Sequence, residues 1–176
     1  MKDTGDREGK IKGYTSSVAE PPGITLRAVH SGDEPFIFHL FAGSRPDLEW
    51  ISGINEDQRN SLVHQQFRCE QEQMLKEYPD ADFYIVLLDG KPVGRLYVHR
   101  GTKLFRILAV SLLSEYRGRG IGSKLLSGIL DEAAEKGKQV RLQVFWYNSS
   151  ARSLYQKLGF LVVKDAGVYC EMQWTP

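Results

Sequence analysis

The chain has 176 residues and a mass of 20.0 kDa, a size that suits one domain with a single hydrophobic core. Hydrophobic residues make up 41% and charged residues 26%, which excludes a fibrous protein and a wholly disordered one. The 23 Lys and Arg residues almost balance the 22 Asp and Glu residues, and this balance argues against nonspecific nucleic-acid binding, which needs a clustered positive field.

The first segment of the chain has the composition of a flexible tail. Residues 1–22 mix Lys, Asp, Glu, Gly and Ser with almost no apolar periodicity and end at Pro21-Pro22. Such a segment supplies no side chains to a core. The sequence therefore predicts a tail at residues 1–22 and a domain at residues 23–176.

A strand and a helix are expected next. Residues 24–29 form an apolar run that favours a strand. Ser31 and Glu34 have the spacing of a capping box, so we expect a helix that begins there and continues to about Phe41.

A longer helix follows a loop rich in Gly, Ser and Pro. Asn55 is placed to cap this helix, and Pro79 stands where it must end, after about Tyr78. Three apolar residues recur at helical spacing along it and predict one buried stripe. They are Val63, Phe67 and Met74.

The second part of the chain alternates strands and helices. The turn pair Asp89-Gly90 between two apolar runs is typical of a β-hairpin. Gly137 and Gly159 are placed as the ends of two helices, the second of which Asn148 caps. The predicted elements are strands at 83–88, 93–98, 104–113 and 140–144, helices at 120–136 and 148–158, and a closing hairpin at 160–174. This order predicts an α/β fold of the mixed α+β kind, with a central mixed sheet and helices on both faces.

Metal, disulfide and membrane chemistry are not expected. Cys69 and Cys170 lie far apart, and no CxxC or His/Cys ligand spacing is present. The apolar runs are too short for a membrane span, and the N-terminus carries acidic residues where a signal peptide is apolar. We therefore expect a cytoplasmic protein without a metal and without a membrane or nucleic-acid partner.

A glycine-rich turn precedes the strongest helix. Gly118, Gly120 and Gly122 bring backbone N–H groups to the positive end of a helix dipole, which is an arrangement that binds phosphate. The positions of Ser123 and Leu125 fit neither a P-loop nor a dinucleotide fingerprint. Alternatively, the glycines only shape a tight turn between strand and helix.

This turn resembles the pyrophosphate-binding signature of the GNAT superfamily of acyl-CoA-dependent N-acetyltransferases, Arg/Gln-x-x-Gly-x-Gly/Ala, in which Arg117, Gly120 and Gly122 match. A second stretch, Asn148-x-x-Ala151-x-x-x-Tyr155-x-x-x-Gly159-Phe160, looks like the closing motif of that family. The resemblance covers about residues 83–163 specifically. It implies a single-domain GNAT-like fold whose sheet splays into a V that holds the pantetheine of acetyl-CoA.

The resemblance also implies roles for individual residues. Val110 would polarise the thioester carbonyl through its amide, and Tyr155 would protonate the departing CoA thiolate. Asn148 is equally explained as a helix cap, Tyr155 as an apolar-stripe residue, and both Arg117 and Arg119 as solvated surface. The residues that the resemblance assigns to acetyl-CoA are Val110, Leu112, Arg117, Gly118, Arg119, Gly120, Ile121, Gly122, Ser123, Asn148 and Tyr155.

One feature of the family is missing. Many members carry an Asp or Glu on the strand before the glycine loop, where it takes the proton of the acceptor amine, and residues 106–111 contain no carboxylate. Replacement bases are Glu49, His64 and Glu70, each of which also suits a solvated helix. Three aromatic residues are candidates for the acceptor site, with core packing or an oligomer contact as the alternative. They are Trp50, Trp146 and Tyr147.

The predicted function is transfer of an acetyl group from acetyl-CoA to a primary amine, by direct attack in a ternary complex, because neither motif contains a cysteine. The alternative is a GNAT-like module that binds CoA but catalyses weakly. The acceptor is an amine of a small molecule, peptide or protein, and a homodimer is a further possibility.

Overall fold

The computed structural model describes residues 23–48 and 50–176. The tail predicted at residues 1–22 lies outside the described residues, as does Glu49.

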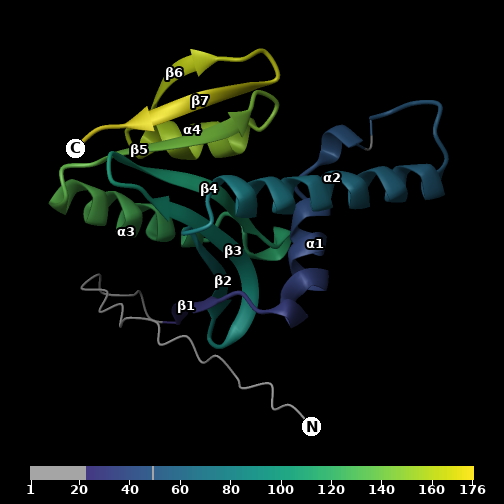
Figure 1. Ribbon diagram of the computed structural model, residues 1–176, viewed down its shortest axis with the longest axis horizontal. Coiled ribbons are helices and arrows are strands. Elements are labelled where there is room, and N and C mark those ends of the chain that lie inside the picture. Colours follow the sequence, from purple (N-terminus) through teal and green to yellow (C-terminus); the bar gives the residue numbers. More distant parts are fainter. Residues whose placement is uncertain (1–22, 49) are drawn as a thin grey trace, which may run out of the picture.

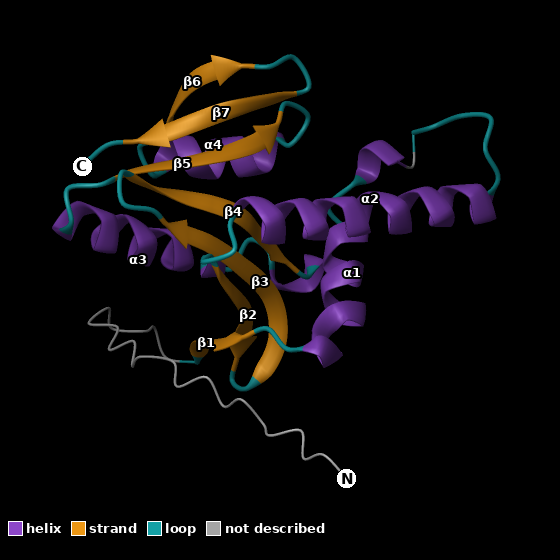
Figure 2. Cartoon of the chain, viewed as in Figure 1, coloured by secondary structure: helices purple, strands orange, loops and turns teal. Residues whose placement is uncertain are grey.

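Seven strands of the described residues form one sheet in the order β1-β2-β3-β4-β5-β7-β6 (Figures 1 and 2). All neighbouring pairs are antiparallel except β4 and β5, which run parallel. The strands are β1 (Ile24–Ala28), β2 (Asp82–Leu88), β3 (Lys91–Arg100), β4 (Leu104–Leu112), β5 (Gln139–Phe145), β6 (Leu161–Asp165) and β7 (Tyr169–Trp174). The predicted mixed sheet is confirmed.

Four α-helices of the described chain cover the two faces of this sheet. They are α1 (Glu34–Ala42), α2 (Glu56–Glu77), α3 (Ile121–Glu135) and α4 (Ser149–Lys157). Helices α3 and α4 contribute to one buried apolar cluster, and α1 and α2 contribute to a second one. Adjacent residues of β2, Ile85 and Val86, belong to different clusters because successive side chains of a strand point to opposite faces. The prediction of helices on both faces is confirmed.

Local signals explain most of the element boundaries. The backbone N–H of Gln58 donates to Asn55 Oδ1 at 2.9 Å, so Asn55 caps α2 as predicted. Asp89 and Gly90 have φ angles of 49° and 78°, the left-handed pair that a two-residue hairpin turn needs. Gly137, with a φ of 60°, follows the C-terminal end of α3 as predicted.

The predicted capping box of Ser31 and Glu34 is wrong. Residues Ser31–Asp33 form a short 3₁₀ turn, and α1 begins only at Glu34. The carboxylate of Asp33 organises this start: it accepts from the backbone N–H of His30 at 2.9 Å and from both terminal nitrogens of Arg27 at 2.7 Å. A charged partner on β1 thus outweighs the local Ser–Glu spacing.

No helix in the described part of the chain is long and apolar enough to cross a membrane.

Candidate functional site

The sheet opens between β4 and β5. These strands pair only from Leu104 opposite Gln139 to Ile107 opposite Leu142. On the other side of β4, the register with β3 shifts so that Leu108 is an extra residue, a β-bulge that bends the strand. The two strands diverge beyond Ile107, as Figure 1 shows. The predicted V-shaped splay is confirmed.

The main-chain groups of β4 beyond the bulge face in two directions. The N–H of Leu113 donates to Val93 O at 2.9 Å, and the carbonyl oxygen of Ser111 lies where a side chain of Gly94 would stand, so both face β3. Because these groups alternate along a strand, those of Val110 and Leu112 face the opening. β5 does not pair with them, because its pairing with β4 ends at Ile107. They can instead pair with an extended ligand, as one more strand would.

The glycine turn lies between this open strand and α3. Gly118 and Gly120 have φ angles of 73° and 79°, and a Cβ atom on either one would meet nothing within 4 Å. Within residues 23–48 and 50–176, no acceptor takes a hydrogen bond from the amides of residues 118–123. The first amides of a helix have no partner inside the helix. The turn therefore presents several free N–H groups, at the positive end of α3, to open space.

Two exposed arginines border the turn. Arg117 Nε donates to the carbonyl oxygen of Leu112 at 2.9 Å, so its side chain folds back onto the open strand. The guanidinium of Arg119 lies over the ring of Tyr116, 5.2 Å from its centre. Both cations lie near the free amides and increase the attraction of the turn for an anion.

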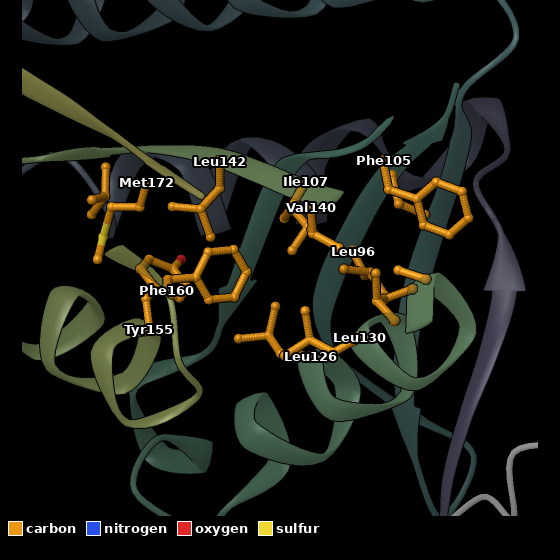
Figure 3. Packing of buried hydrophobic residues seen from close by; sticks show 14 of the residues in the cluster. Leu96, Phe105, Ile107, Leu126, Leu130, Val140, Leu142, Tyr155, Phe160 and Met172 are labelled. Atoms are coloured by element: carbon orange, nitrogen blue, oxygen red, sulfur yellow. The ribbon is translucent and has the colours of Figure 1, made fainter. Parts of the chain in front are cut away.

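Tyr155 lies on α4 and Asn148 caps it, beside this opening. Tyr155 is 6% exposed and packs at 5.8 Å from Phe160, in the cluster that Val110 and Leu112 border (Figure 3). Burial raises its pKa to about 12, so the phenol is protonated at neutral pH. Asn148 Oδ1 accepts from Ala151 N at 3.1 Å, so the predicted helix cap is confirmed.

The opposite face of the opening carries a polar bridge between the α1–α2 connection and the end of β5. Arg45 donates to both carboxylate oxygens of Asp47 through Nε and Nη2, and the Tyr147 hydroxyl donates to Asp47 Oδ1 at 2.8 Å. Hydrogen bonding from Arg45 holds the pKa of Asp47 below its usual range, and burial together with Asp47 raises the pKa of Tyr147 to about 12. Trp50, 66% exposed, contacts the ring of Tyr147 edge-on at 5.6 Å.

Of the two replacement bases that the structure describes, Glu70 is the one that contacts the residues around the open strand. Its Oε1 atom accepts from Arg95 Nη2 at 3.1 Å, and Arg95 Nε donates to Ser111 Oγ at 3.2 Å. His64 stacks on Phe38 of α1 at 3.9 Å. Glu49 lies outside the described residues.

Sequence reasoning missed Arg45, Asp47 and Arg95. The first two lie in a loop without periodicity. Arg95 lies within a strand, and its partner on α2 is 25 positions away in the sequence. One signal for the pair was present: position 70 falls on the apolar stripe of Phe67 and Met74, where an acidic residue needs a partner.

A cavity of about 430 Å³ lies elsewhere, between α1 and α2. It is lined by Val29, His30, Ser31, Glu34, Ile37, Phe67, Arg68, Gln71 and Glu72. It shares no residue with the glycine turn, β4 or β5. We place the candidate site at the opening of the sheet, where the unpaired end of β4 and the free amides lie, and not in this cavity. Among the described residues, no three His, Cys, Asp or Glu side chains gather closely enough to hold a metal ion.

Comparison with known proteins identifies the family. The model of the acetyltransferase (GNAT) family matches residues 49–160, which is more than half of the sequence. The chain belongs to the GNAT family. This match includes the open end of β4, the glycine turn and α4, so the resemblance inferred from the two motifs is confirmed.

Relatives of this GNAT chain include N-alpha-acetyltransferase 30 of Schizosaccharomyces pombe, 37% identical over 86 residues, which are 45% of this chain and 57% of that protein. Mycothiol acetyltransferase of Corynebacterium glutamicum is 33% identical over 132 residues, which are 70% of this chain and 44% of that protein. The chain thus spans about half the length of these curated relatives.

The fold matches solved GNAT structures. The PaiA N-acetyltransferase of Thermoplasma acidophilum, solved in complex with coenzyme A, aligns with a TM-score of 0.67 at 22% identity. The alignment covers 87% of this chain and 99% of that one. At this level of identity the match supports the fold alone.

Proposed function

We propose that residues 23–176 form an N-acetyltransferase domain that transfers an acetyl group from acetyl-CoA to a primary amine. One observation carries the proposal: the outward main-chain groups of Val110 and Leu112 lie beside a turn of free amides at the start of α3. An elongated ligand with an anionic end fits this combination. The relatives, named as acetyltransferases, support the same reaction.

The residues of the turn would hold the pyrophosphate of CoA. The amides of residues 118–123 supply directed N–H donors, and Arg117 and Arg119 supply positive charge beside them. The pantetheine would pair with β4, where Leu112 offers its N–H while its carbonyl already accepts from Arg117. Asn148 would contact the cofactor through its side-chain NH₂ group, since its oxygen caps α4.

The transfer would occur by direct attack in a ternary complex. As the amine nitrogen bonds to the thioester carbon, negative charge moves to the carbonyl oxygen, which the amide of Val110 would stabilise. The C–S bond then breaks, and the Tyr155 hydroxyl is the donor for the departing thiolate. Its high pKa keeps the phenol protonated, so that it can donate to the sulfur.

The alternative, a CoA-binding module with weak catalysis, is motivated by the absence of a carboxylate on β4. Release of free CoA in the presence of a panel of alkylamines, amino acids and peptide N-termini discriminates the two functions. We expect turnover on at least one class of amine. Tight calorimetric binding of acetyl-CoA without turnover on any member of the panel would favour the module.

Compartment and assembly are further proposals. We propose, as expected from the sequence, that the protein is cytoplasmic and binds no metal, with acetyl-CoA and an amine as its ligands.

One observation supports a homodimer. β6 is an edge strand on which Leu161, Val162 and Val163 are exposed. A second copy that pairs antiparallel with this edge would cover them. We expect light scattering to give the mass of a dimer. Val163→Lys should reduce this mass, and Leu75→Lys on α2 should not. A monomer mass for the unsubstituted protein would refute the dimer.

A further inference from the structure

Helix α2 carries an acidic residue on the face that it turns toward the sheet. Val63, Phe67 and Met74 belong to the apolar cluster under α2, and Glu70 shares their helical spacing, three residues after Phe67 and four before Met74. A carboxylate at such a position destabilises the fold unless a cation pairs with it. Here the cation is Arg95 of β3.

Arg95 is buried and fixed by its neighbours, whereas Glu70 is partly open to solvent. The side chain of Arg95 is 4% exposed, with Nη2 bonded to Glu70, Nε bonded to Ser111, and its guanidinium over the ring of Tyr97 at 5.1 Å. The side chain of Glu70 is 31% exposed. An incoming ligand can therefore reach the carboxylate while the guanidinium behind it stays in place.

The Glu70–Arg95 pair contacts the end of β4 at which the proposed reaction takes place. Ser111, which holds Arg95, directly follows Val110, whose amide faces the opening. Side chains of adjacent strand residues lie on opposite faces. Ser111 accordingly points toward α1 and α2, the face opposite the cluster of α3, α4 and Tyr155. Glu70 thus approaches the opening from the face opposite Tyr155.

We propose that Glu70 binds the acceptor amine and receives its proton, in place of the carboxylate missing from β4, with Arg95 and Ser111 as positioning residues. This inference rests on the proposed acetyl transfer. Glu70 first takes one proton from the bound ammonium group and releases it to solvent, and the free amine then attacks. As the nitrogen bonds to the thioester carbon it becomes positively charged again, and the carboxylate stabilises that charge. The second proton then passes from nitrogen to Glu70, while the C–S bond breaks and the Tyr155 hydroxyl donates a hydrogen bond to the departing thiolate. Solvent afterwards takes the proton of Glu70 and protonates the thiolate.

The surroundings of Glu70 keep it available for this role. Arg95 and Tyr97 face it from β3, and Arg45 faces it from the α1–α2 connection. Arg95 and Arg45 are thus two cations beside this carboxylate. Arg45 is itself bonded to Asp47, so the cations do not exclude an incoming ammonium group.

The test is the pH dependence of kcat/KM for an alkylamine acceptor in Glu70→Gln, which keeps an oxygen for Arg95. We expect the unsubstituted protein to level off near neutral pH. The variant should lose about 10²–10⁴-fold in kcat/KM at pH 7 and rise toward pH 9 or beyond as free amine accumulates, since an alkylamine has a pKa of about 10.4. Acetyl-CoA affinity should not change.

Glu72→Gln, an exposed change on the same helix, is the matched control and should leave the profile unchanged. Ser111→Ala should lower kcat with KM unchanged, and Ser111→Thr, which retains a hydroxyl for Arg95, should restore it. These readouts remain available if Glu70→Gln is too unstable to assay.

The outcomes separate the two proposals. A wild-type profile in Glu70→Gln, a wild-type kcat in Ser111→Ala, or an unsubstituted protein whose rate climbs to pH 9, would overturn the role of Glu70 and leave acetyl transfer standing. Binding of acetyl-CoA without any turnover by the unsubstituted protein would overturn both.

Discussion

Replacing Gly120 should remove CoA binding at a small cost in stability. Gly120 caps α3 with a φ of 79°, and a Cβ atom there would meet nothing within 4 Å. A side chain therefore fits sterically, but the left-handed backbone costs about 1–2 kcal/mol. For a domain of this size that loss lowers Tm by about 2–8 °C. The fold should survive, and the new side chain would occupy the space in front of the free amides.

The size of the binding loss follows from the charge. A Glu carboxylate about 5 Å from one phosphate charge costs about 3 kcal/mol at an effective dielectric constant of about 20, which is about a hundredfold or more in Kd. Gly120→Gln occupies the same space without the charge, so the difference between the two variants isolates the electrostatic part.

Titration calorimetry with CoA and thermal melts are the two assays. Gly137→Glu is the matched control, because Gly137 has a φ of 60° and equally open surroundings at the other end of α3. It should show a similar loss of Tm with CoA affinity unchanged. A Gly120→Glu variant whose Kd stays near that of the unsubstituted protein would refute the location of the pyrophosphate.

Three further predictions concern single side chains. Tyr147→Phe removes the hydrogen bond to Asp47 and should raise KM for the acceptor with acetyl-CoA affinity unchanged; an unchanged KM would separate this bridge from the acceptor site. Asp33→Asn should flatten the acid limb of the stability curve, because hydrogen bonding from Arg27 lowers the pKa of Asp33 to about 2. The stabilisation by this carboxylate is complete above its unfolded pKa of about 3.9 and is lost as the pH falls toward 2. It amounts to at most about 2.5 kcal/mol, reduced by screening at Arg27, which is 32% exposed; equal acid limbs in chemical denaturation would contradict it. Tyr155→Phe should lower kcat by about 10²-fold, the lower end of the acid–base range, with acetyl-CoA affinity unchanged. Full activity would leave Tyr155 with a packing role alone.

The elements set by local physics could be predicted from the sequence. Asn55 caps its helix with its own side chain, and the left-handed turns at Gly120 and Gly137 need glycine whatever surrounds them. The prediction at Ser31 failed because a distant partner, Arg27 on β1, holds the carboxylate that organises the helix start. Local motifs thus predict a boundary where no ion pair across elements competes with them.

The proposed CoA half of the site could be predicted from the sequence more fully than the proposed acceptor half, for the same reason. Main-chain amides of a short segment make most of the candidate CoA contacts, so a motif such as Arg117-x-x-Gly120-x-Gly122 is enough to find them. Glu70, Arg95 and Ser111 come from a helix and two strands. The register of β3 against β4 places Arg95 opposite Ser111, and the packing of α2 on the sheet brings Glu70 to Arg95.

The burial of Tyr155 narrows what that residue can contribute to the proposed transfer. Its pKa is raised to about 12, whereas a thiol has a pKa of about 8.5. Complete proton transfer from this phenol to a fully formed thiolate is therefore uphill by about 5 kcal/mol. A hydrogen bond to the sulfur while charge develops on it carries no such cost, and it strengthens as the C–S bond lengthens. Tyr155 on one face of the opening would thus stabilise the leaving group as a donor, and Glu70 on the other face would stabilise the charge on the amine.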